Sequence, residues 1–112
     1  MKEYDLSSLL EMLGNDENAL KDILGAFLSD FPEQMEKLMN GIKNNDFDSI
    51  AKSAHAIKGV VGNFNLTECY ELAKEIEICA KTAEIAIIGE KTDKLNDDLK
   101  NFREWIKEKY SI

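Results

Sequence analysis

The chain contains one histidine, His55, and the residues around it have types and a spacing that favour nucleophilic chemistry. In a helix, side chains three and four positions apart lie on one face, so Lys58 and Gly59 are neighbours of His55. A neutral imidazole has a free nitrogen lone pair near pH 7 and can act as a nucleophile. Lys58 places a positive charge where it can balance the charge of a phosphoryl group. The sequence therefore predicts a nucleophilic histidine with a cation beside it.

Small residues and a second cation share the histidine side of this predicted helix. Gly59 lies four residues after His55, and Gly62 lies three residues further on. A glycine inside a helix costs about 1 kcal/mol relative to alanine, so two of them call for a reason. Ala51 and Lys52 precede the histidine by about one turn. We expect Ala51, Lys52, Gly59 and Gly62 to form a surface that a partner molecule can approach closely.

The stretch 54–59, which reads Ala-His-x-x-Lys-Gly and is followed by Gly62-Asn63, resembles the histidine-containing phosphotransfer (HPt) domains of two-component phosphorelays. An Ile76-Glu77 pair follows at the distance usual in that family, and the lengths on either side fit a whole domain. The resemblance implies that His55 accepts a phosphoryl group from a receiver-domain aspartyl phosphate and passes it to an aspartate on another receiver. The reactive atom would be Nε2.

The same resemblance assigns the remaining components of the reaction. Family members commonly use the residue at position 77 to orient the histidine, so Glu77 is the expected hydrogen-bond partner of His55; a surface ion pair with Lys81 is the alternative. The partners would be receiver domains of response regulators or hybrid histidine kinases. They would supply the magnesium, while this chain would need no cofactor of its own. No Walker loop or glycine-rich nucleotide loop is present, so we expect a phosphoryl carrier rather than an enzyme.

Two other classes of function are compatible with a helical chain of this kind. One is a non-catalytic adaptor that binds a partner protein, in which His55 is an incidental surface residue. The other is a metal-binding bundle that combines His55 with carboxylates, although no Glu-x-x-His spacing is present. Incubation with a phosphorylated receiver separates the carrier from the adaptor.

The net charge and the length of the chain limit the kinds of partner and the number of domains that we expect. Fourteen basic and 22 acidic residues give a net charge of −8, which repels nucleic acids and anionic lipid surfaces. The first five residues lack an apolar signal segment, and the apolar run 85–88 is too short to span a membrane. We expect a single, monomeric, cytoplasmic domain over residues 1–112, with neither nucleic acid nor membrane as a partner.

The two cysteines do not predict a disulfide. Cys69 and Cys79 are ten residues apart on one predicted helix, which separates them by about 15 Å along its axis. A disulfide needs Cα atoms within about 7 Å of each other. Two reduced thiols are therefore expected.

Apolar residues recur with a helical period along the chain, and no strand pattern competes. We expect an all-α fold, an antiparallel up-and-down four-helix bundle with two shorter N-terminal helices packed on it. Asp5, Asn15 or Asp16, and Asp46 are the expected N-caps, and Gly14 the expected stop of the first helix. The expected helices span about 6–13, 16–29, 31–43, 47–61, 66–82 and some 25 residues from Ile85.

Two of these expected boundaries depend on local signals. Pro32 is favourable in the first turn of a helix, so it predicts a new helix that begins after a break near residue 30. Asn65, with Glu68 three residues later, is a capping-box pattern and predicts the start of the next-to-last helix.

Overall fold

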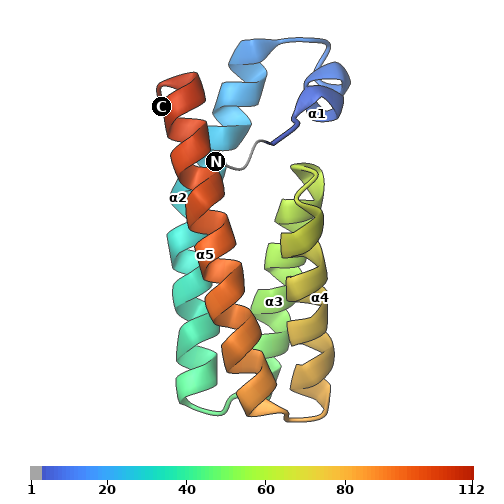
Figure 1. Cartoon of the computed structure of the whole chain (residues 1–112), viewed down its shortest axis with the longest axis vertical. Coiled ribbons are helices and arrows are strands. Elements are labelled where there is room, and N and C mark those ends of the chain that lie inside the picture. The colour runs from blue at the N-terminus through green and yellow to red at the C-terminus, as the bar shows by residue number, and fades with distance from the viewer. Residues whose placement is uncertain (1–3) are drawn as a thin grey trace.

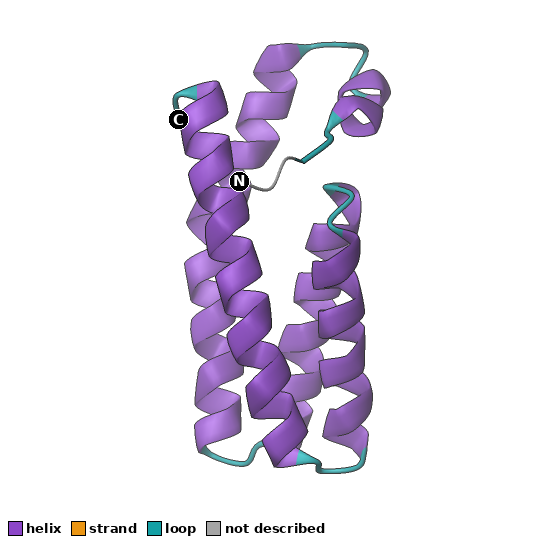
Figure 2. Cartoon of the chain, viewed as in Figure 1, coloured by secondary structure: helices purple, strands orange, loops and turns teal. Residues whose placement is uncertain are grey.

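The computed structural model describes residues 4–112, and every regular element among them is a helix (Figures 1 and 2). Residues 1–3, part of the segment expected to lack a signal sequence, lie outside the described residues. The all-α prediction is confirmed for residues 4–112. The helices are α1 (Ser7–Met12), α2 (Glu17–Lys43), α3 (Phe47–Asn63), α4 (Thr67–Lys81) and α5 (Ile85–Tyr110).

The four long helices lie side by side, and short turns join consecutive helices at alternate ends of the molecule (Figure 1). Helix α3 packs between α2 and α4, and α5 packs against both α4 and α2. The short helix α1 lies across one end of this group, next to the start of α2. The arrangement makes α3 and α4 neighbours, so residues from these two helices can form one site.

One apolar stripe from each long helix fills the centre of the bundle. Burying a leucine, isoleucine or phenylalanine side chain contributes about 1.5 to 3 kcal/mol, so this set supplies much of the stabilisation. The largest side chains with almost no exposure include Leu20, Leu24, Leu38, Ile50, Ile76, Ile88, Leu95, Leu99, Phe102 and Ile106.

Helix α2 runs without a break through Pro32, so the prediction of two separate helices over 16–29 and 31–43 is wrong. Proline lacks the N–H that would bond the preceding turn, which costs about 3 kcal/mol or more inside a helix. Pro32 itself is exposed, whereas Phe27, Phe31 and Met35 on either side of it are buried. Burial of this continuous stripe offsets the cost of the proline. The described chain therefore has one short N-terminal helix in place of the two expected.

Two aspartate caps begin the helices as predicted. The Oδ1 atom of Asp16 accepts hydrogen bonds from the backbone N–H groups of Asn18 and Ala19, at 3.0 and 3.2 Å, and fixes the start of α2. Asp46 accepts from the backbone N–H of Ser49 at 3.2 Å and begins α3. Such caps typically contribute about 1 kcal/mol each.

The capping box predicted at Asn65 is wrong. Helix α4 begins at Thr67 after Leu66, and no side-chain cap bonds its first turn. Asn65 instead adopts a left-handed backbone conformation with φ of 57°. Asparagine tolerates this conformation better than most residues, so it serves the turn rather than the helix.

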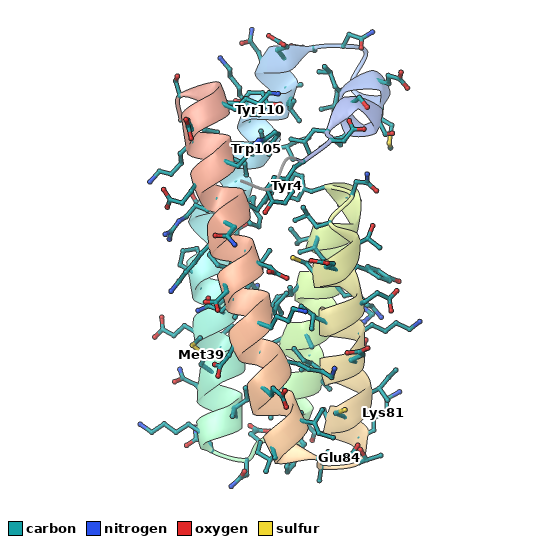
Figure 3. The ribbon with its side chains drawn as sticks, viewed as in Figure 1. Tyr4, Met39, Lys81, Glu84, Trp105 and Tyr110 are labelled. Atoms are coloured by element: carbon teal, nitrogen blue, oxygen red, sulfur yellow. The ribbon has the colours of Figure 1, made fainter. Side chains whose placement is uncertain are left out.

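Aromatic contacts pack Tyr4, which precedes α1, against the C-terminal half of α5. The ring of Tyr4 lies 5.0 Å from that of Phe102 and 5.3 Å from that of Trp105, both edge to face. Tyr110 packs on the far side of Trp105, at 6.1 Å (Figure 3). The N-terminal segment is thereby held against the bundle. Asp5 accepts a hydrogen bond from the backbone N–H of Ser7 at 2.9 Å, but Leu6 is the N-cap of α1, so the prediction of Asp5 as that cap is wrong.

Three further observations bear on the expectations from the sequence. Gly14 has φ of 68° and follows α1, as expected of a helix stop. Neither Cys69 nor Cys79 forms a disulfide bond. Within residues 4–112, no helix is long and apolar enough to cross a membrane.

Candidate functional site

His55 lies in the middle of α3, on the side of the helix that faces away from the core. Ile50, Ala54, Ile57 and Val61 form the buried stripe of this helix, and each is at most 4% exposed. The side chain of His55 is 69% exposed. The helical period alone produces this separation, because residues one position from the stripe are turned by about 100°. The imidazole is therefore fixed at its base and open to solvent at its tip.

Glu77 on α4 connects His55 to Lys58. Its Oε2 atom lies 3.0 Å from Nδ1 of His55, and its Oε1 atom lies 2.8 Å from Nζ of Lys58. Both carboxylate oxygens are thus engaged by residues of the neighbouring helix α3. The expected contact between Glu77 and the histidine is present, and the lysine that pairs with Glu77 is Lys58 rather than Lys81.

The Lys58–Glu77 pair is partly buried, whereas the imidazole ring of His55 is exposed. The side chains of Lys58 and Glu77 are 22% and 21% exposed. The hydrogen bond from Lys58 lowers the pKa of Glu77 below its ordinary value, and His55 contributes less to this shift. The same bond raises the pKa of Lys58. Both members of the pair are therefore charged at neutral pH.

The carboxylate of Glu77 determines which nitrogen of the imidazole carries the proton. An ionised carboxylate can only accept hydrogen bonds, so Nδ1 must donate its N–H to Oε2. In the neutral ring, the lone pair then belongs to Nε2, on the opposite edge from Glu77. This tautomer leaves the free lone pair on the edge of the ring that does not contact Glu77.

The glycines near His55 have different surroundings. A Cβ atom added at Gly59 would meet no heavy atom within 4 Å, so the space beside His55 is open. A Cβ at Gly62 would lie 3.6 Å from the ring of Tyr70 on α4. Gly62 therefore accommodates an aromatic side chain of this same protein, which the sequence did not indicate. Ala51 is half-buried, and Lys52 is exposed.

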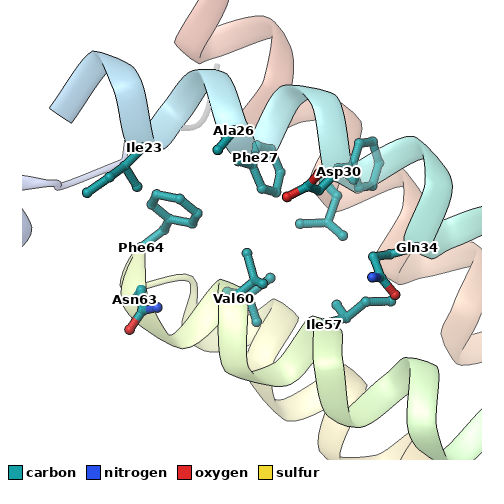
Figure 4. A pocket seen from close by; sticks show the side chains of 12 residues that line it. Ile23, Ala26, Phe27, Asp30, Gln34, Ile57, Val60, Asn63 and Phe64 are labelled. Carbon is teal, nitrogen blue, oxygen red and sulfur yellow. The ribbon is translucent and has the colours of Figure 1, made fainter. Parts of the chain in front are cut away.

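An apolar groove of about 220 Å³ lies between α2 and α3, to one side of this site (Figure 4). Its lining includes Ile23, Phe27, Ile57, Val60 and Phe64. His55, Lys58 and Glu77 do not line it. The imidazole is therefore presented on an open surface rather than inside a pocket, an arrangement suited to a reaction in which the other reactant brings its own cleft.

Metal ligation by this region was one of the alternatives from the sequence. Among the described residues 4–112, no three histidine, cysteine, aspartate or glutamate side chains come together in a way that could hold a metal ion. The contacts of His55 with Glu77 and of Glu77 with Lys58 account for both carboxylate oxygens.

Comparison with known protein families identifies a family for this chain. The family model described as the Hpt domain matches residues 22–105, which include α3, α4 and all three residues of the His55, Lys58 and Glu77 cluster. No curated protein and no solved structure matches the chain.

Proposed function

Because the chain belongs to the Hpt domain family, we propose that it is a phosphorelay intermediate that carries a phosphoryl group on Nε2 of His55. The family acts in phosphorelays by histidine phosphotransfer. The observation that carries the proposal for this chain is the contact of Nδ1 with Glu77, at 3.0 Å, which leaves Nε2 as the free nitrogen. The donor would be the aspartyl phosphate of one receiver domain, and the acceptor an aspartate of another.

The transfer needs one bond to form and one to break. The lone pair on Nε2 attacks phosphorus, and the bond between phosphorus and the aspartyl oxygen of the donor breaks, which leaves an aspartate carboxylate. The ring gains positive charge as the bond to phosphorus forms, and Glu77, hydrogen-bonded at Nδ1, stabilises that charge. In the second step an aspartate oxygen of the acceptor attacks phosphorus, and Nε2 leaves with its lone pair. The Nδ1 proton stays in place throughout.

The receiver would supply what this chain lacks. Aspartyl phosphates lie in a cleft of the receiver, so the histidine has to enter that cleft. The open space at Gly59 and the exposed Lys52 suit such an approach, and Ala51 and Gly62 continue the same side of α3. We propose that magnesium on the receiver provides most of the charge stabilisation, and that this chain needs no cofactor of its own. We propose that it acts in the cytoplasm as a monomer.

A transfer assay tests this function. A receiver domain labelled with radioactive phosphate at its aspartate is mixed with the chain, and a second, unlabelled receiver is added later. We expect label to appear on the chain and then to move to the second receiver. Binding of the receiver without any transfer of label would support the adaptor function instead.

A further inference from the structure

Lys58 pairs with Glu77, the residue that contacts the Nδ1 edge of the His55 ring. Its Nζ atom lies 2.8 Å from Oε1 of Glu77, and its side chain is only 22% exposed although it lies next to an imidazole that is 69% exposed. Glu77 contacts the ring at Nδ1, and Nε2 is on the opposite edge. In the resting protein the ammonium of Lys58 is therefore bound to Glu77, the group that contacts the Nδ1 edge of the ring.

A carboxylate that orients a histidine by a hydrogen bond can also make that histidine a weaker nucleophile. A negative charge within about 4 Å of an imidazole favours the protonated ring. In the protonated ring both nitrogens carry a hydrogen, so Nε2 has no lone pair with which to attack. Glu77 without a counter-charge would therefore hold His55 in the correct orientation and at the same time favour its inactive form.

We propose that Lys58 is a positioning residue that acts on His55 through Glu77. The ion pair with Lys58 offsets the charge of the carboxylate, so Glu77 accepts the Nδ1 hydrogen without favouring a second proton on Nε2. The inference rests on the proposed role of His55 as the nucleophile. It assigns Lys58 a task in the resting protein, before any phosphoryl group arrives.

The other charged groups about one turn from His55 or Glu77 on their own helices are cations. On α3, Lys52 lies one turn before the histidine and Lys58 one turn after it; on α4, Lys74 and Lys81 lie one turn to either side of Glu77. On α2, Lys37 shares a surface hollow with Lys52 and lies 3.7 Å from Glu33. On α5, the described ion pair toward α4 joins Lys91 to Glu75. The carboxylate in contact with the ring is that of Glu77, so its balance with Lys58 is the relevant one.

The experiment is a titration of the full chain by nuclear magnetic resonance. His55 is the only histidine, so long-range proton–nitrogen spectra of the imidazole report one residue and distinguish the protonation of Nδ1 from that of Nε2. The proteins to compare are the wild type, Lys58→Met, Glu77→Gln and the double variant. Lys52→Met is the matched control, because it removes a cation at the same sequence distance from His55 but one not paired with Glu77.

Lys58→Met should move the midpoint of the His55 titration to higher pH, by on the order of half a pH unit, since Glu77 is then unbalanced. The same substitution in the Glu77→Gln background should have a much smaller effect, and so should Lys52→Met in the wild type. An equal shift in both backgrounds would mean that Lys58 acts on the ring directly. An unmoved midpoint, or a shift no larger than that of Lys52→Met, would also overturn the inference.

The titration requires no phosphodonor, so its outcome is independent of whether phosphotransfer occurs. A second readout separates the two roles of Lys58 during transfer. If Lys58 acts only through Glu77, transfer by Lys58→Met should fall by no more than about threefold near neutral pH, the factor that a half-unit shift allows, and should recover at alkaline pH, where Nε2 loses its proton. A slow rate at every pH would instead indicate a lost contact to the phosphoryl group.

Discussion

Two of the glutamates of helix α4, Glu75 and Glu77, lie two residues apart, and each pairs with a lysine on a different neighbouring helix. Glu77 faces α3, where its carboxylate is 2.8 Å from Lys58, and Glu75 faces α5, where its carboxylate is 2.5 Å from Lys91. Each pair raises the pKa of its lysine. The difference is the second oxygen of Glu77, which lies 3.0 Å from Nδ1 of His55.

The Glu75–Lys91 and Glu77–Lys58 ion pairs each connect two helices, but only the second also contacts an imidazole ring. An ion pair at the surface typically contributes less than about 1 kcal/mol to stability, so Glu75 and Lys91 form a modest connection between α4 and α5. The Lys58–Glu77 pair forms the same connection between α3 and α4 and also sets the tautomer of a ring. A third group, rather than the pair itself, gives the contact a chemical role.

The largest effect should come from replacing His55. His55→Gln should abolish phosphoryl acceptance completely while the helical circular dichroism spectrum stays unchanged, because the side chain is 69% exposed. In the wild type the label should be labile in acid and stable in alkali, as expected of a phosphoramidate. Labelling of the Gln variant at another residue would contradict the assignment.

The next largest effect concerns steric access to the exposed side of α3 around His55. Gly59→Gln should reduce transfer from a receiver by about a hundredfold, because a long side chain would fill the open space beside His55. Gly89→Gln on α5 is the matched control, since a Cβ there also meets nothing within 4 Å. We expect the control to transfer at the wild-type rate. Equal rates for both variants, measured with the same labelled receiver, would show that the space at Gly59 is not needed for docking.

The two glutamates provide the most direct test of the comparison. Glu77→Ala should slow transfer by about tenfold, since the loss of one hydrogen bond to a charged group costs about 1.5 kcal/mol. Glu75→Ala should leave the rate unchanged. Single-turnover transfer rates are the measurement, and a comparable loss in both variants would indicate a general effect of charge on receiver binding.

The turn that leads from α4 into α5 should respond to a change in backbone freedom. Ala83 has φ of 56°, a conformation that costs an alanine about 1 kcal/mol relative to glycine. Ala83→Gly should therefore raise the free energy of unfolding by about 1 kcal/mol. Ala26→Gly, at an exposed position inside α2, should lower it by a similar amount. Urea unfolding followed by circular dichroism measures both free energies. A loss of stability in the Ala83 variant would contradict an unfavourable backbone conformation at this position.

The smallest effect is the stability that the pairs contribute. Glu77→Gln should lower the free energy of unfolding by less than about 1 kcal/mol at neutral pH. The pKa of Glu77 is lowered in the folded protein, so its contribution is present above the ordinary glutamate pKa and is lost as pH falls through the lowered value. The difference between variant and wild type should vanish in acid. A difference that persists there would mean that packing, not charge, causes it.

Much of the fold was predictable because its signals are local. Asp16 and Asp46 cap their helices through residues two or three positions away, and the helical period places His55 outside the stripe of Ile50, Ala54 and Ile57. The wrong prediction of a helix break near Pro32 arose because this feature depends on non-local packing. Whether a proline breaks a helix depends on how much apolar surface the continuous helix buries, and that is a property of the packed bundle.

The sequence singled out His55, Lys58 and Glu77 as candidate site residues, but it did not indicate all of their contacts. The motif indicated His55 and Glu77, and helical spacing placed Lys58 beside the histidine. The pairing of Lys58 with Glu77 spans 19 positions in the sequence and depends on the register of α3 against α4, which no local pattern fixes. The ring of Tyr70 beside Gly62 escaped prediction for the same reason.

The aromatic contacts that hold the N-terminal segment have a spectroscopic consequence. Trp105 is the only tryptophan in the chain, and its ring lies on α5, 5.3 Å from Tyr4. Its fluorescence therefore reports the environment at the end of α5 where the segment before α1 packs. His55, on α3, gives the only histidine signals in nuclear magnetic resonance spectra. The protein thus carries two intrinsic probes: the fluorescence of Trp105 reports the packing of Tyr4, and the imidazole signals of His55 report the cluster of His55, Lys58 and Glu77.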